Sequence, residues 1–239
     1  MNNQLYLDDM KRKYYIAEII AFEKTYKHKI FPIFENIEQE ADKFAQEKFE
    51  KLCRNNAYNE YADEASFAES TNDETISYYG ELSIAKYQIT ATSISSLYHL
   101  WEQQIRKFLF CEISHSKNLD FKKFCCNVMD DIKERLPKYN IEIEKFSTYN
   151  KLNEHRLLTN VIKHGDGDSA TKLRKINETL LKKNDFSNFL DTTFLEKNLN
   201  INQDLFFDYA KNIKEFWNEL PGRAFLCETK SCKLKKESG

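Results

Sequence analysis

One short segment gathers side chains that suit phosphodiester chemistry. Residues 154–167 read EHRLLTNVIKHGDG, and a helical period places four polar residues on one face with aliphatic residues opposite. These four are Arg156, Asn160, Lys163 and His164. A histidine transfers protons near neutral pH, and neighbouring cations balance the charge of a phosphate. The segment therefore suits phosphodiester cleavage, with His164 as general acid or base.

A structural explanation of the same residues stays open. A polar face with Arg, Asn and Lys is typical of any surface helix, and His followed by Gly is an ordinary helix end. Asp166 and Asp168 next to His164 suggest metal ligands, yet they also suit a glycine-ended helix followed by a capped one. We expect no metal site here.

Glu154 falls on the apolar side of its own predicted helix. A buried carboxylate needs a partner, and the segment 82–112 offers His99, Glu102 and Arg106 on one stripe. We therefore expect Glu154 to contact Arg106 or His99. The alternative is that Glu154 simply favours the helix dipole in the first turn.

Composition excludes several classes of protein. The 239 residues include 36 Lys and Arg against 38 Asp and Glu, so a globally basic nucleic-acid binder is excluded, although a local basic patch is not. With only 5 Gly and 3 Pro, long helices are favoured over a β-sandwich or an α/β fold. The sequence has no Walker loop, dinucleotide glycine fingerprint, nucleophile elbow or His-Glu-x-x-His helix. The chemistry must then come from side chains on helices, and we expect no cofactor.

The compartment is predicted from the N-terminus and the six cysteines. The first residues have no apolar signal-peptide core, and no apolar run approaches the roughly 18 residues of a spanning helix. We therefore expect a cytoplasmic protein with reduced thiols and no membrane association. Cys227 and Cys232 lack a second ligand pair, so zinc is not expected.

Apolar residues recur at helical spacing in every long segment, which predicts an all-α protein of at least five helices. The acidic stretch 55–81 has seven Asp or Glu and no Lys or Arg, and it reads as a long surface loop or a weak helix. We expect a single helical domain over 1–226 and a polar, basic tail over 227–239. The predicted helices cover 8–31, 33–53, 82–112, 120–136, 150–164, a short helix from Asp168 or Ser169, and 204–220.

Basic residues gather after the acidic stretch, within 151–183. We expect this region to form a basic surface that binds nucleic acid in a salt-dependent way. The alternative is a set of scattered, solvated side chains. The residues are Lys163, Lys172, Arg174, Lys175, Lys182 and Lys183.

Two runs of residues together resemble HEPN domains. One is Glu154-x-Arg156-Leu157-x-x-Asn160-x-x-Lys163-His164-Gly165-x-Gly167, and the other, earlier in the chain, is Leu97-Tyr98-His99-Leu100-Trp101-Glu102-Gln103. These are all-α domains of prokaryotic toxins, phage-defence proteins and RNA-processing factors, and the resemblance covers about 82–180. It implies a metal-independent endoribonuclease of a bacterial defence or toxin system, in which two protomers usually combine to form the site.

The resemblance implies roles for particular residues. Arg156, Asn160 and His164 would be catalytic. Lys163, Lys172 and Arg174 would bind the substrate RNA, and Glu102 and Glu154 would support the site. Seven residues separate Arg156 from His164, which places their Cα atoms about 12 Å apart on a helix, farther than in the family. A homodimer would let Arg156 act across the interface, so we expect one. Two alternatives are that Lys163 takes the place of Arg156, or that the chain is a non-catalytic relative.

A second function from another class remains open. The same polar stripe could belong to a non-catalytic interaction module that binds a nucleotide, a nucleic acid or a partner protein encoded nearby. The two hypotheses differ in whether RNA is cleaved when it is bound.

Overall fold

The computed structural model describes the chain except for residues 1–3, 58–60, 62, 115–118, 182–197 and 228–239. Helices dominate the described residues, as the sequence predicts. The chain divides into two compact units, each built from separate stretches. The first unit comprises Met1–Glu23, Ile94–Asn160 and Asp204–Gly239, and the second comprises Lys24–Ser93 and Val161–Gln203.

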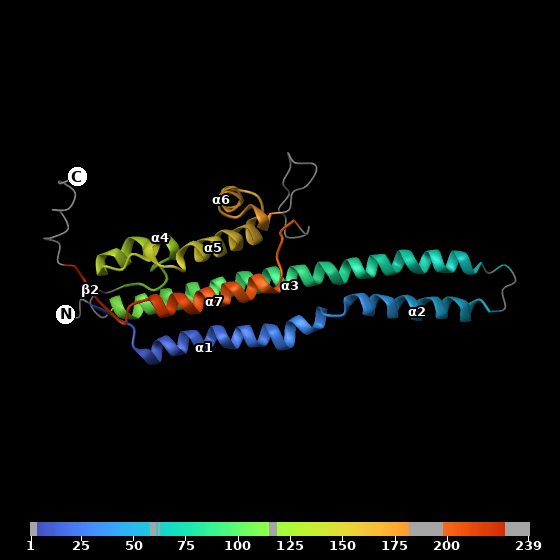
Figure 1. The fold of residues 1–239 in the computed structure, drawn as a ribbon, viewed down its shortest axis with the longest axis horizontal. Helices are drawn as coiled ribbons and strands as arrows, with labels where there is room; N and C mark the ends of the chain where they lie inside the picture. Colours follow the sequence, from blue (N-terminus) through green and yellow to red (C-terminus); the bar gives the residue numbers. More distant parts are fainter. Residues whose placement is uncertain (1–3, 58–60, 62, 115–118, 182–197, 228–239) are drawn as a thin grey trace. The chain divides into compact units, whose positions relative to one another are not determined.

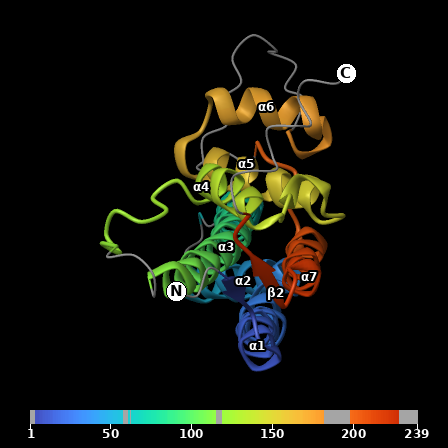
Figure 2. The same cartoon turned by 90° about the vertical axis from the view of Figure 1, so that its left-hand side faces the viewer.

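The first unit stacks helices on both sides of a central pair. The pair consists of α7 (Gln203–Glu219) and the C-terminal half of α3 (Glu64–Ser114). α1 (Asp9–Thr25) covers one side, and α4 (Val128–Arg135) and α5 (Tyr149–His164) cover the other (Figures 1 and 2). Strands β1 (Gln4–Tyr6) and β2 (Arg223–Phe225) pair antiparallel, with Leu5 opposite Ala224.

Aromatic side chains and one buried amide hold the first unit together. Trp101 and Trp217 are fully buried, and Trp217 stacks on Tyr15 of α1 with ring centroids 4.4 Å apart. Gln104 of α3 accepts a hydrogen bond from the Trp217 indole at 2.9 Å and donates to the Tyr15 carbonyl and to Glu18. This single amide therefore joins α1, α3 and α7.

The second unit contains a long antiparallel helix pair. α2 (Ile37–Asn55) runs beside the N-terminal half of α3 (Figure 1). Phe44 stacks on Tyr78, the Tyr78 hydroxyl donates to Glu40 at 2.6 Å, and Lys48 pairs with Glu74 at 2.7 Å. The short helix α6 (Asp168–Ile176) also belongs to this unit.

The all-α prediction is confirmed. Of the stretch 55–81, for which the sequence allows both a loop and a weak helix, residues 64–81 are helical and form the first turns of the 51-residue α3. Two predicted helix starts need correction. The helix predicted over 82–112 begins at Glu64. The predicted helix 120–136 begins only at Val128, because the Arg106 guanidinium binds the carbonyls of Phe121 and Phe124 at 2.6 and 2.7 Å. Cys125 has φ 49°, a left-handed conformation that interrupts a helix.

The remaining predicted elements lie close to their expected positions. The first helix passes into a π-helical turn at Tyr26–Ile30 and a 3₁₀ turn at Phe31–Phe34 around Pro32. Three more 3₁₀ turns cover Leu136–Tyr139, Ile143–Lys145 and Glu178–Leu180. The single domain over 1–226 stays a prediction: the chain crosses between the two units four times, each time inside a continuous helix. Of the predicted tail, 228–239 lies outside the described residues.

The Gln104 contacts predict a stability effect. Gln104→Leu removes the acceptor of the buried Trp217 indole and the donor to Glu18, so we expect a loss of about 2–3 kcal/mol in the free energy of unfolding. Urea denaturation measures this loss. Gln103→Leu, at the exposed neighbouring position, is the matched control and should change stability by less than about 0.5 kcal/mol. Equal midpoints for the two variants would contradict the role assigned to Gln104.

Candidate functional site

α5 carries the predicted polar stripe and ends where the sequence indicates. Gly165 follows the last residue with φ 69°, a conformation that glycine adopts without strain. Its amide donates to the Val161 carbonyl at 2.8 Å. Before the helix, Ser147 and Thr148 donate their hydroxyls to Glu219 of α7 at 2.5 and 2.6 Å. The end of α7 therefore anchors the start of α5.

Glu154 is buried, as its position on the apolar side predicts, with 7% of its surface exposed. Its partner was predicted wrongly. The Tyr209 hydroxyl of α7 donates to Glu154 Oε1 at 2.8 Å, and Lys151 Nζ lies 3.0 Å from the same oxygen. The expected partners on α3 have other contacts: Arg106 binds backbone carbonyls, and His99 binds Glu102.

His155 is the second buried polar residue of α5, and sequence reasoning assigned it no role. Its Nε2 lies 2.8 Å from the Ile94 carbonyl of α3, and its ring stacks on Tyr209 with centroids 4.0 Å apart. Burial lowers the pKa of His155 to about 3, so the ring is neutral and donates from Nε2. Its position on the apolar face was the signal for a structural histidine.

Lys151 completes the surroundings of Tyr209. Its ammonium lies 5.0 Å from the centroid of the Tyr209 ring and 2.8 Å from Asp208. Burial disfavours the charged amine, but the contacts with Asp208 and Glu154 outweigh that cost and raise the pKa of Lys151. The Tyr209 ring therefore contacts His155 and Lys151, while its hydroxyl binds Glu154.

Arg156 projects to the α3 side of the first unit. Its guanidinium donates twice to Asn153 Oδ1, at 3.0 and 3.3 Å, and its side chain is half-buried. The hydroxyl of the buried Tyr98 has a raised pKa, because burial and the Glu102 charge raise it more than Arg156 lowers it. Glu102 and Arg156 therefore both influence the charge state of the Tyr98 hydroxyl.

His99 is a candidate that sequence reasoning placed beside the site without a catalytic role. Its Nδ1 lies 2.8 Å from Glu102 Oε2, and it shares a side of α3 with Glu102 through an i, i+3 spacing. The other ring nitrogen is buried and has no hydrogen-bond partner among the described residues. A carboxylate that orients a histidine in this way is common at acid–base sites. Here, however, the second ring nitrogen of His99 is covered and cannot reach a substrate, so His99 can only support the site.

The other stripe residues differ in exposure. Asn160 is half-buried and belongs to the first unit, whereas Lys163 and His164 are exposed and belong to the second. Arg156 and His164 are thus assigned to different units of the chain. Both residues lie in the continuous helix α5, on which eight residues correspond to about 12 Å along the axis.

The predicted substrate-binding residues of α6 differ in solvent exposure. Lys172 and Lys175 are exposed, whereas Arg174 is half-buried, with Nη2 covered and without a hydrogen-bond partner among the described residues. Lys182 and Lys183 lie outside the described residues. The exposure of Lys172 and Lys175 fits both a basic surface and a set of scattered, solvated side chains, so the basic surface over 151–183 stays a prediction.

No family model, curated protein or solved structure matches the chain. Within the described ranges, no three His, Cys, Asp or Glu side chains are grouped so that they could hold a metal ion. Among the described helices, none combines the length and the apolar content that crossing a bilayer requires. The candidate site is therefore defined by the positions and contacts of this chain's own residues.

The Glu154 contacts predict that Glu154→Ala destabilises the fold by about 1–3 kcal/mol, because the variant leaves the Tyr209 hydroxyl buried without an acceptor. Thermal or urea denaturation measures the change. Glu154→Gln keeps an acceptor for the hydroxyl and should lose less. Full stability in Glu154→Ala would contradict the burial of this carboxylate.

The neutral His155 predicts a pH dependence of stability. The folded-state pKa of about 3 lies below the ordinary value of 6.5, so the unfolded chain binds a proton that the folded chain does not. This contribution is complete above pH 6.5 and is lost as the pH falls toward 3, by at most about 1.4 kcal/mol per pH unit. Urea denaturation between pH 7 and 4 measures the slope. His155→Gln, which has no titrating ring, should show a shallower slope than the wild type.

Proposed function

We propose that the chain is a metal-independent endoribonuclease of the HEPN-like kind, acting in a bacterial defence or toxin system in the cytoplasm. One observation carries the proposal. Two buried polar residues, Glu154 and His155, fix one side of α5 against α3 and α7. The half-buried Arg156 and the exposed Lys163 and His164 remain available to a ligand.

Each residue has a role in cleavage by the adjacent 2′-hydroxyl. His164 takes the proton from the 2′-oxygen as this oxygen attacks phosphorus and the bond to the 5′-oxygen breaks, and solvent water protonates the departing 5′-oxygen. In the alternative role, solvent water takes the 2′-proton and the His164 imidazolium protonates the 5′-oxygen. The products are a 2′,3′-cyclic phosphate and a free 5′-hydroxyl. Asn160 positions the phosphate or the 2′-hydroxyl, and Arg156 and Lys163 stabilise the charge that develops on the phosphoryl oxygens.

Other residues support binding and position. Lys172 is exposed and suits contact with RNA phosphates outside the cleaved bond, and Arg174 follows two residues later in α6. Glu102 binds the His99 ring at 2.8 Å on the same side of α3, and it supports the site by holding that imidazole in place. The buried Glu154 keeps α5 in place through Tyr209.

The separation along α5 favours a homodimer. Cα atoms eight residues apart on a helix lie about 12 Å from each other, and helical side chains lean toward the N-terminus, so Arg156 leans away from His164. Two antiparallel copies of α5 around a two-fold axis would bring Arg156 of one protomer to His164 of the partner subunit. Each dimer would then contain two composite sites.

The decisive experiment measures cleavage of a labelled single-stranded RNA in the presence of EDTA. We expect wild-type protein to form 2′,3′-cyclic-phosphate ends, and His164→Asn to lower the rate by at least about 100-fold with unchanged melting temperature, since His164 is exposed. His28→Asn, at another exposed histidine, is the matched control and should keep full activity. Tight RNA binding without cleavage by the wild type would favour the interaction module instead.

Mixing two inactive variants tests whether the site is shared. Equal amounts of Arg156→Ala and His164→Asn protein, unfolded and refolded together, would form heterodimers in which one of the two composite sites is intact. We expect about a quarter of the wild-type activity, because half of the dimers are mixed and half of their sites are intact. No recovery would contradict a site that combines two protomers.

A further inference from the structure

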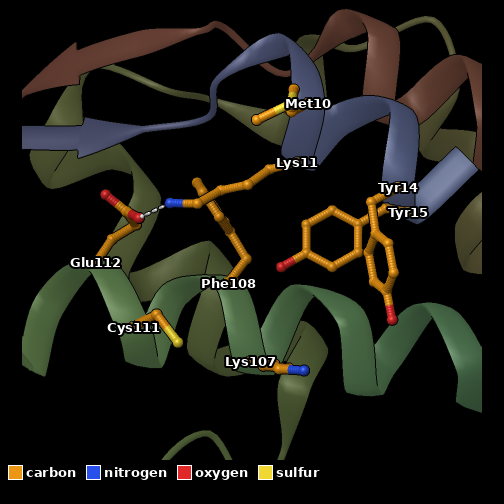
Figure 3. A pocket seen from close by; sticks show the side chains of 8 residues that line it. All are labelled: Met10, Lys11, Tyr14, Tyr15, Lys107, Phe108, Cys111 and Glu112. Atoms are coloured by element: carbon orange, nitrogen blue, oxygen red, sulfur yellow. Dashed lines mark hydrogen bonds and ion pairs between the residues drawn. The ribbon is translucent and has the colours of Figure 1, made fainter.

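A cavity of about 480 Å³ opens in the first unit between α1 and the C-terminal part of α3 (Figure 3). Met10 and Tyr15 of α1 and Phe108 of α3 form much of its apolar wall. Lys107 and Cys111 line it from α3, and both are exposed to solvent. Its volume lies within the range of about 300–1,000 Å³ that is typical of small-molecule sites.

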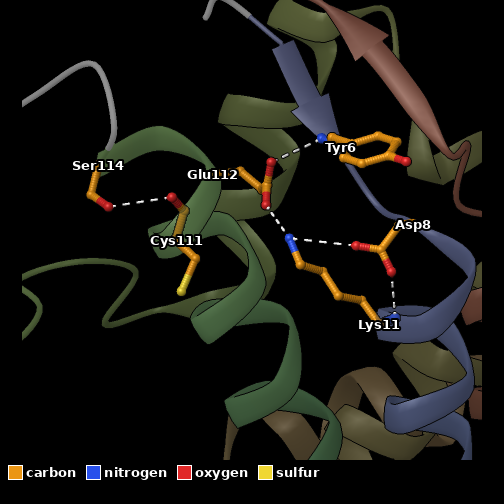
Figure 4. A network of polar contacts seen from close by, with 6 residues as sticks. All are labelled: Tyr6, Asp8, Lys11, Cys111, Glu112 and Ser114. Carbon is orange, nitrogen blue, oxygen red and sulfur yellow. Dashed lines mark hydrogen bonds and ion pairs between the residues drawn. The ribbon is translucent and has the colours of Figure 1, made fainter.

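Glu112, the acidic residue at this cavity, already has a hydrogen-bond partner for each carboxylate oxygen. Glu112 accepts from Lys11 Nζ at 2.8 Å with one oxygen and from the Tyr6 backbone amide at 3.0 Å with the other (Figure 4). Lys11 also lies 3.9 Å from Asp8, and its hydrogen bond to Glu112 raises its pKa. This cluster therefore offers a ligand neither an open acceptor nor an unpaired charge.

Tyr15 presents an open donor to the cavity. Its side chain is 7% exposed and stacks on Trp217, yet its hydroxyl has no hydrogen-bond partner within the described part of the chain. Burial raises the pKa of Tyr15 to about 12, so the hydroxyl keeps its proton at neutral pH. The nearby Glu18 carboxylate accepts from Gln104 instead.

Lys107 supplies the second open donor. Its ammonium is exposed and forms no ion pair with any residue that the structure describes, and Figure 3 shows it on the α3 side of the cavity. Tyr14 also lines the cavity, but its hydroxyl contacts the Glu18 carboxylate, which raises the pKa of Tyr14. The open polar groups of Tyr15 and Lys107 are thus both donors, and the Lys107 ammonium carries a positive charge. The complementary ligand has an apolar body and an anionic acceptor.

We propose that this cavity binds a small amphipathic anion, namely an aromatic or short aliphatic molecule with one carboxylate or sulfonate group. The apolar body packs against Phe108 and Met10, and the anionic group accepts hydrogen bonds from the Tyr15 hydroxyl and the Lys107 ammonium. The proposal is independent of RNA cleavage, because none of these residues belongs to the proposed nuclease site.

Two fluorescent probes of similar size test the proposal. 1-Anilinonaphthalene-8-sulfonate carries the anionic group, and N-phenyl-1-naphthylamine has the same ring system without it. We expect saturable binding of the sulfonate at one site per chain. Lys107→Gln should weaken sulfonate binding by about five- to tenfold, the value of one charge-assisted hydrogen bond at a partly solvated site, and leave the neutral probe unchanged.

Matched variants separate charge from packing. Lys107→Arg keeps the cation and should bind the sulfonate within about twofold of the wild type. Lys123→Gln removes an exposed lysine away from the cavity and should have no effect. Tyr15→Phe removes only the open hydroxyl, so it should weaken the sulfonate without lowering the melting temperature.

A measurement on wild-type protein avoids any effect of substitution on folding. Cys111 lines the cavity, so bound sulfonate should slow its reaction with a thiol reagent, while the exposed Cys126 keeps its rate. Mass spectrometry after brief labelling separates the two cysteines. The proposal is overturned if saturating sulfonate leaves Cys111 unprotected, if Lys107→Gln binds like the wild type, or if Lys107→Gln weakens both probes equally.

Discussion

The rotation of α5 depends on keeping His155 neutral beneath the Tyr209 ring. The imidazole donates to the Ile94 carbonyl, stacks on Tyr209 and adjoins Glu154, whose carboxylate accepts from the hydroxyl of the same tyrosine. If α5 were rotated about its own axis by one residue position, these polar groups would face apolar side chains and each would lose its hydrogen-bond partner. The positions of Arg156 and Asn160 follow from this fixed rotation.

Other polar contacts, from the buried Gln104 to the exposed Ser147, also join the helices of the first unit. Gln104 joins α1, α3 and α7, and the hydroxyls of Ser147 and Thr148 join the start of α5 to the end of α7. Apolar surfaces on helices are compatible with many packing angles, whereas a hydrogen bond tolerates few. The aromatic core thus supplies most of the driving force, and the polar contacts select one arrangement.

The helical class and most helix ends could be predicted, because local spacing and glycine or proline signals determine them. Gly165 ends α5 where expected, and the burial of Glu154 follows from the helical wheel. The partner of Glu154 could not be predicted, since Tyr209 lies 55 residues away and a single sequence carries no signal of that pairing. The late start of α4 likewise depends on Arg106, a distant side chain that binds the carbonyls of the preceding turn.

The left-handed backbone at Cys125 has a practical consequence for spectroscopy. It separates the surroundings of two adjacent thiols, since Cys125 is buried and Cys126 is exposed. Burial raises the pKa of Cys125 to about 11, so its thiol stays protonated and reacts slowly with electrophiles. A reporter group attached to Cys126 therefore remains in solvent and leaves the neighbouring core intact. The signal of such a label would report movement of the neighbouring backbone, whose carbonyls at Phe121 and Phe124 bind Arg106.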